Sequence, residues 1–129
     1  MTMAWCFPDE ATPHTEAVLD LLAGQHEIIV PTLWPYEVTS VLLGAVRRKR
    51  ITSAKAREFI ADLDSLNILI DEGTQNVFGR VYFLAERHQL TGYDAAYLEL
   101  ALRKQLPLAS LDRDLNEAAA TEGVALVQP

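Results

Sequence analysis

Four acidic residues stand at points where the chain passes into a predicted helix. Asp94 lies in the opening turn of an apolar helix, and Asp112 and Asp114 directly follow a short apolar strand. Glu37 repeats this order of strand, turn and acid earlier in the chain. In an open α/β sheet, the carboxyl ends of the strands and the helix starts beyond them face one crevice, where ligands bind. The spacing therefore predicts one shared, negatively charged pocket.

Carboxylates gathered in one pocket favour a bound cation. Hard divalent ions such as Mg²⁺ and Mn²⁺ prefer oxygen ligands. Clustered carboxylates repel one another unless a cation lies between them or the pKa of one of them rises. Two such ions can hold an attacking water and a leaving oxygen in line across a phosphodiester. The acids thus favour a metal-binding site of a nuclease.

Helix capping is the alternative interpretation of three of these acids. Thr91 and Asp94 have the spacing of a capping box. Either Asp112 or Asp114 fits the N-cap of the helix that follows. Glu37 differs, because it falls about one turn past a helix start inside an apolar stretch, where a carboxylate is costly to bury without a cation or a donor. From the residues alone, capping and metal binding both stay open.

Length and composition describe one soluble globular domain spanning residues 1–129. Half of the residues are hydrophobic and 22% are charged, which is not the composition of a disordered chain. No apolar run reaches the ~20 residues needed to cross a bilayer, and the N-terminus lacks the features of a signal peptide. The single cysteine, Cys6, fits a reducing cytoplasm. We therefore expect a cytoplasmic protein.

The charge balance argues against a general nucleic-acid coat protein, which would be basic. The formal net charge is −7 and the pI is about 4.8. That balance still permits an enzyme that meets RNA through a divalent metal and one local basic patch. The only basic run is Arg47-Arg48-Lys49-Arg50. A solvated helix end and a phosphate contact are both open interpretations of this run.

Other catalytic patterns are absent from the sequence. It contains no phosphate-binding G-x-x-x-x-G-K-[ST] loop, no G-x-S-x-G elbow, and no C-x-x-C or H-E-x-x-H zinc pattern. The scattered His14, His26 and His88 are expected on the surface. Tyr93 and Tyr97 lie four apart on one predicted helix, where they either pack in the protein or stack on a base.

Apolar periodicity predicts helices alternating with short strands. The first helix begins near Thr12 and ends at Gly24, and Thr32 is the expected N-cap of the second. The predicted helices cover about 12–24, 32–50, 51–63, 73–88, 92–102 and 114–121. The predicted strands are 26–30, 67–70, 106–111 and 124–127, the last at an edge. This alternation predicts an α/β fold with a mostly parallel sheet covered on both faces.

Four stretches in this order carry a family resemblance over essentially the whole chain. They are residues 4–10, 30–38, 90–97 and 108–115, which include Trp34-Pro35-Tyr36-Glu37, Thr91-Gly92-Tyr93-Asp94 and Ser110-Leu111-Asp112-Arg113-Asp114. With them, the chain resembles a PIN-domain protein, specifically a VapC-type toxin ribonuclease of a type II toxin–antitoxin pair. The resemblance implies a three-layer α/β/α fold.

The same resemblance implies an activity, a metal and partners. VapC-type proteins are Mg²⁺- or Mn²⁺-dependent endoribonucleases, usually homodimeric, and each is inhibited by a cognate antitoxin protein. The family's acidic positions map onto Glu37, Asp94 and Asp112, with Asp114 a possible further ligand. Their implied role is to hold the metal and, through it, to activate water against an RNA phosphate.

One family feature has no counterpart in this sequence. Members of the family open with a central β-strand that ends in an aspartate, whereas this chain begins Met1-Thr2-Met3. Asp9 and Glu10 lie too far along to replace that aspartate. We therefore expect a fold that lacks its first strand, exposed strand edges, one metal ligand fewer, and little or no activity for the chain as given. A start assigned too late, a trimmed chain and a truncated inactive relative are the explanations left open. The alternative function is a non-catalytic PIN-like protein-binding module.

Overall fold

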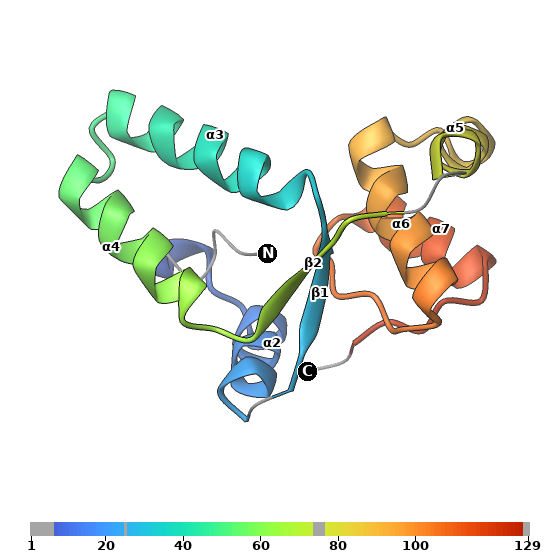
Figure 1. Cartoon of the computed structure of the whole chain (residues 1–129), viewed down its shortest axis with the longest axis horizontal. Helices are drawn as coiled ribbons and strands as arrows, with labels where there is room; N and C mark the ends of the chain where they lie inside the picture. The colour runs from blue at the N-terminus through green and yellow to red at the C-terminus, as the bar shows by residue number, and fades with distance from the viewer. Residues whose placement is uncertain (1–6, 25, 74–76, 128–129) are drawn as a thin grey trace. The chain divides into compact units, whose positions relative to one another are not determined.

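The computed structural model describes residues 7–24, 26–73 and 77–127 of the chain. In these residues, two short strands are interspersed among the helices (Figure 1), so the protein is a mixed α/β protein, as the sequence predicts. The expectations about Cys6 and about a missing N-terminal strand lie outside the described residues. The elements are η1 (Pro8–Glu10), α2 (Pro13–Ala23), β1 (Ile28–Pro31), α3 (Trp34–Arg47), α4 (Ser53–Asp64), β2 (Ile68–Asp71), α5 (Val77–His88), α6 (Gly92–Lys104) and α7 (Arg113–Thr121).

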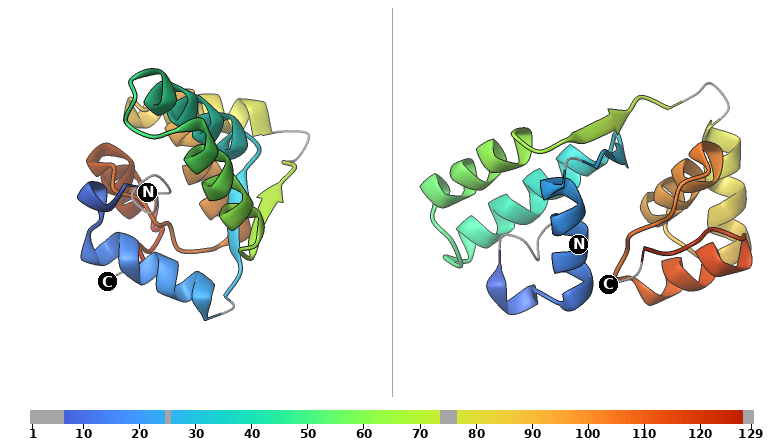
Figure 2. Two further views of the ribbon diagram at one scale, coloured as in Figure 1. Left: turned by 90° about the vertical axis from the view of Figure 1, so that its left-hand side faces the viewer. Right: turned by 90° about the horizontal axis from the view of Figure 1, so that it is seen from below.

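The described residues fall into two compact units, one ending at Ile70 and the other beginning at Asp71. In the first unit, β1 and β2 pair as a small parallel sheet. Helices α3 and α4 form a hairpin in the same unit (Figure 2). Its core holds Val38, Leu42, Ala56 and Leu63, each less than a tenth exposed. Burying such leucines and valines contributes about 1.5–3 kcal/mol apiece, so apolar packing holds this hairpin closed.

The second unit is built around α6, which packs against both α5 and α7. Ala95 and Leu98 on α6 are completely buried, and Ala119 on α7 is too. Alanines at these contacts let the helix backbones approach closely. The core of this unit consists of Leu84, Ala95, Leu98, Ala101, Leu108, Leu115, Ala118, Ala119 and Val124.

Helix ends follow the sequence signals closely, with one exception. Thr12 caps α2 in a reciprocal capping box with Thr15, Pro13 lies in the first turn, and Gly24 is the C-cap, as predicted. The prediction that Thr32 caps the second helix is wrong. The N-cap of α3 is Leu33, which makes no side-chain cap bond. The Glu37 N–H donates to the Leu33 carbonyl at 3.0 Å at the start of α3, so Leu33 is the N-cap and Thr32 lies one residue before it.

The third and fourth predicted strands are much shorter than expected. In the described residues, 106–111 and 124–127 meet only at an isolated parallel bridge between Leu108 and Leu126. The Leu106 N–H donates to the Ala101 carbonyl at the end of α6, 3.1 Å away, and Pro107 has no N–H to give. The Ser110 carbonyl accepts from the Asn116 side chain at 3.0 Å. Because helix ends take these backbone groups, few remain for a ladder.

Candidate functional site

Asp94 lies in the first turn of α6, where the sequence places it. Thr91 is the N-cap of this helix, and its Oγ1 accepts a hydrogen bond from the Asp94 N–H at 3.1 Å. That bond is the Thr91 half of the predicted capping box. Asp94 is half-buried, and Ala95 beside it is completely buried. The positive end of the helix dipole favours a carboxylate at this position, and the cap bond from Thr91 fixes the helix start that carries Asp94.

Asp112 and Asp114 share the start of α7. Asp112 is the N-cap, and its Oδ1 accepts from the Asp114 N–H at 3.1 Å. The Asp112 N–H in turn donates to Ser110 Oγ at 2.9 Å. The capping interpretation therefore holds for Asp112 and not for Asp114. A carboxylate has two oxygens, so a cap bond through Oδ1 does not prevent Asp112 from binding a cation through the other.

Glu37 lies in the first turn of α3, in the first unit of the protein. It is half-buried and directly precedes the buried Val38. The sequence analysis expects a partner for a carboxylate in this apolar setting, and Glu37 does make a polar interaction in the structure. All four predicted acids thus stand at the starts of three helices, α3, α6 and α7.

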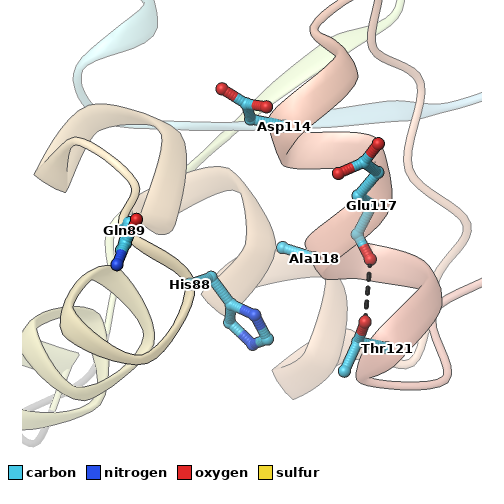
Figure 3. Close-up of a pocket in the computed structure, with 6 residues that line it drawn as sticks. All are labelled: His88, Gln89, Asp114, Glu117, Ala118 and Thr121. Carbon is cyan, nitrogen blue, oxygen red and sulfur yellow. Dashed lines mark hydrogen bonds between the residues drawn. The ribbon is translucent and has the colours of Figure 1, made fainter.

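An open hollow of about 340 Å³ lies beside Asp114 in the second unit. Figure 3 shows that α7 and the end of α5 supply its walls. Acid, amide and imidazole side chains make this lining strongly polar. The lining residues are His88, Gln89, Asp114, Glu117, Ala118 and Thr121.

The four acids have the right donor chemistry for Mg²⁺ or Mn²⁺, since each offers hard carboxylate oxygens. The positions of these acids support a shared metal site less fully than their chemistry does. Within residues 7–24, 26–73 and 77–127, no three or more His, Cys, Asp or Glu side chains lie where they could hold one ion together. Asp94, Asp112 and Asp114 belong to the second unit and Glu37 to the first. Convergence of the four acids on one metal therefore stays a prediction.

A buried ion network fixes the helix that carries Asp94. Arg103 on α6 donates to both carboxylate oxygens of Asp71, at 2.7 and 3.2 Å, and to Glu99 at 2.7 and 3.2 Å. Arg80 on α5 lies 3.4 Å from the same Glu99. Glu99 is only 2% exposed. The hydrogen bonds from Arg103 hold the pKa of Asp71 below its ordinary value, and the bonds to Asp71 and Glu99 raise the pKa of Arg103. Within the second unit, the network ties Asp71, α5 and α6 together.

Sequence reasoning missed this network, although one signal was present. Glu99 and Arg103 are four residues apart on a predicted helix, the spacing of a stabilising ion pair. Glu99 is also a single acid in an otherwise apolar run, between Leu98 and Leu100. A buried carboxylate there requires a cation. Asp71 gives no comparable signal, because it is distant from Arg103 in sequence.

The prediction that the histidines lie on the surface is wrong for His88. Only 10% of its side chain is exposed, and Nε2 lies 2.7 Å from Glu122 Oε2. Arg87 approaches the same carboxylate at 3.5 Å. The pairing joins the last turn of α5 to the C-cap of α7, so it has a structural role beside the hollow. His26 is exposed, as predicted, and His14 is half-buried.

The two tyrosines of α6 have different surroundings. Tyr97 packs against the core of the second unit, whereas Tyr93 is 66% exposed. Packing is therefore confirmed for Tyr97. Base stacking by Tyr93 stays untested. None of the helices in the described part of the chain combines the length and apolar character that crossing a bilayer requires.

Comparison with known protein families identifies the class of this protein. Residues 3–121 match the PIN domain. The chain therefore belongs to the PIN-domain family, whose members are typically metal-dependent nucleases, and a nuclease-type function follows for this fold. The match spans all four acids, Glu37, Asp94, Asp112 and Asp114. No curated protein matches the chain.

Proposed function

We propose that this protein is a Mg²⁺- or Mn²⁺-dependent endoribonuclease, the toxin of a type II toxin–antitoxin pair of the VapC kind. The observation that carries this proposal is the match to the PIN domain over residues 3–121, within which acids occupy the starts of α3, α6 and α7. The toxin assignment rests on the four sequence stretches that resemble VapC-type proteins. The substrate is RNA.

The proposed ligands are Glu37, Asp94 and Asp112, with Asp114 as a further ligand. Thr91 fixes the helix start that presents Asp94, and Ser110 fixes the backbone that presents Asp112. When bound, a divalent ion would polarise an RNA phosphate and lower the pKa of an attacking water. The protein's own contribution is to hold several carboxylates at fixed helix starts, where the positive ends of the helix dipoles favour an anionic side chain.

The proposed partners follow from the same resemblance. The protein forms a homodimer in the cytoplasm and is inhibited by a cognate antitoxin. Native mass spectrometry of the purified chain tests the dimer, and purification with the product of an adjoining gene tests the antitoxin. A monomer that captures no such product would contradict both proposals and leave the nuclease proposal standing.

A second candidate function is a non-catalytic PIN-fold module that binds a partner protein. One observation favours it: the described residues contain no group of three or more His, Cys, Asp or Glu placed to hold an ion. Such a module would keep the fold and the helix-capping roles of Thr91 and Asp112 without turnover. The two candidates differ in whether metal binding and RNA cleavage depend on these acids.

Cleavage of labelled single-stranded RNA in Mn²⁺ separates the two candidates. Two forms should be compared: the 129-residue chain, and the same chain preceded by an apolar strand ending in aspartate. We expect the extended form to cleave the RNA in a reaction that EDTA stops and that Asp94→Asn abolishes. We expect little or no cleavage by the 129-residue form. Asp64→Asn is the matched control, because Asp64 is an exposed acid at the end of α4. Cleavage that survives EDTA and Asp94→Asn would contradict the metal-dependent mechanism, and no cleavage by either form would favour the binding module.

A further inference from the structure

Positive charge in this acidic protein is concentrated in one short segment. The chain has eleven lysines and arginines against eighteen acids, yet six of the basic residues fall within residues 47–57. No acid occurs between Glu37 and Glu58. The segment is therefore strongly positive while the rest of the chain is strongly negative. Its basic residues, which we call the basic turn, are Arg47, Arg48, Lys49, Arg50, Lys55 and Arg57.

The residues of the basic turn lie in and beside the ordered connection between two packed helices. It joins the end of α3 to the start of α4 within the first unit (Figures 1 and 2). The Arg50 N–H donates to the Ala45 carbonyl at 2.9 Å and the Lys49 N–H to the Val46 carbonyl at 3.0 Å. This pair of bonds is a Schellman motif. At the other side, Thr52 Oγ1 accepts from the Lys55 N–H at 3.1 Å. Backbone bonds thus fix the turn on both sides.

Lys49 occupies a backbone conformation that glycine would adopt more easily. Its φ is +59°, the left-handed region that ends many helices. Gln89 and Gln105 have the same conformation after α5 and at the end of α6, with φ of 55° each. The described non-glycine residues in this conformation are thus polar, and only the one in the basic turn is charged. The left-handed backbone conformation at Lys49 therefore does not require a charged residue there.

Internal acids neutralise only part of the basic turn. Arg50 pairs with Asp9 at 2.9 Å and Glu10 at 3.0 Å, and its guanidinium lies 3.7 Å from the centre of the Phe7 ring. Lys55 lies 3.9 Å from Glu58.

The remaining charges of the basic turn face solvent. Arg57 donates to Ser53 rather than to an acid. Within the part of the chain that the structure describes, Arg47, Arg48 and Lys49 form no ion pair, and all three are exposed. Three neighbouring cations on a fixed turn repel one another unless an anion lies among them.

We propose that the basic turn binds the phosphate backbone of single-stranded RNA, a proposal that rests on the ribonuclease function above. Guanidinium groups pair with phosphate oxygens through two parallel hydrogen bonds, and four of the six basic residues are arginines. A net charge of −7 repels a polyanion from most of the surface. Local positive charge then steers RNA to this one turn.

Fluorescence anisotropy with a labelled single-stranded RNA tests the proposal. EDTA is kept present, so no metal-dependent cleavage can occur. For a single strand, the slope of log affinity against log salt changes by about 0.7 for each phosphate that the protein no longer neutralises. We expect Lys49→Gln to reduce the slope by about that amount, and the triple change of Arg47, Arg48 and Lys49 to glutamine by about 2. Lys104→Gln, an equal loss of charge on α6, should leave the slope unchanged.

A second pair of variants separates binding from folding. Lys49→Gly and Gln105→Gly both place glycine at a left-handed position, so both should raise the melting temperature. Only Lys49→Gly should weaken RNA binding. RNA binding by Lys49→Gly with an unchanged salt slope would overturn the proposal. A fall in melting temperature cannot account for weaker binding here, because the expected change is a rise.

Two further outcomes distinguish the occupant and the underlying function. Poly-L-glutamate at matched charge should compete weakly with RNA, because carboxylates do not reproduce a phosphodiester backbone with its bases. Equal competition would overturn the RNA assignment in favour of an acidic protein segment. RNA binding through the basic turn without any metal-dependent cleavage would refute the nuclease proposal but not this one. Metal-dependent cleavage by a triple variant whose RNA binding is intact would refute this proposal but not the nuclease proposal.

Discussion

Arg103 binds Asp71 through two parallel hydrogen bonds, from Nη2 to Oδ2 at 2.7 Å and from Nη1 to Oδ1 at 3.2 Å. The same guanidinium also holds the buried Glu99 one turn earlier on α6. One cation therefore satisfies two carboxylates from separate elements. This bidentate pairing anchors the last turn of α6, the helix whose first turn holds Asp94.

Removing Arg103 should destabilise the protein strongly. Arg103→Leu leaves the largely buried Asp71 without its cation and leaves Glu99 with only Arg80, 3.4 Å away. Breaking a buried ion pair in this way costs about 3–5 kcal/mol. The side chains of Arg103, Asp71 and Glu99 are only 17%, 13% and 3% exposed. Urea denaturation measures the effect. Lys104→Leu, at the exposed next position, is the control and should change the free energy of unfolding by less than about 0.5 kcal/mol. Equal effects of the two changes would contradict the role of Arg103.

Acid should weaken the same pairing. Hydrogen bonds from Arg103 hold the pKa of Asp71 below its ordinary value of 3.8. A carboxyl whose pKa is lower in the folded state contributes stability that is fully present above the unfolded pKa. That contribution is lost as the pH falls through the folded pKa. Unfolding free energies measured between pH 6 and pH 2 should therefore fall more steeply in the wild type than in Asp71→Asn. Parallel curves would refute the contribution of Asp71.

Two threonine caps offer a matched test of what holds Asp94. Thr91 caps α6 and Thr52 caps α4, and each Oγ1 accepts a backbone N–H at 3.1 Å. Thr91→Ala and Thr52→Ala should each cost about 1 kcal/mol of stability. Only Thr91→Ala should weaken Mn²⁺ binding, because its N–H partner belongs to Asp94. Identical Mn²⁺ titrations for the two variants would mean that the cap plays no part in the metal site.

The sequence predicts the helices well because each carries its own signals. Apolar periodicity places all six described α-helices, and Thr12, Gly24 and Thr91 are caps where their residue types indicate them. The strands are harder to predict, because a short apolar run does not reveal what its backbone groups will bond. Around Leu108, helix ends take those groups, and only a single bridge to Leu126 forms.

The sequence likewise predicts some features of the candidate site and not others. Local chemistry predicts that Asp94 and Asp112 stand at helix starts, because capping depends on near neighbours in sequence. The pairing of Arg103 with Asp71 and of His88 with Glu122 depends on how distant segments pack, which no local pattern encodes. For the same reason, the sequence states which acids suit a divalent ion but not how closely Glu37 approaches the others.

Isothermal titration with Mn²⁺ tests the shared acidic site most directly. The chain should bind Mn²⁺, and Glu37→Gln, Asp94→Asn and Asp112→Asn should each weaken binding by at least about tenfold, since loss of even a supporting contact costs 10–100-fold. Asparagine also caps helices well, so Asp112→Asn keeps the start of α7 intact. Because one ion would join these acids, the Glu37→Gln and Asp94→Asn effects should not add. Mn²⁺ binding that none of the three changes weakens would show that these carboxylates do not hold a common metal.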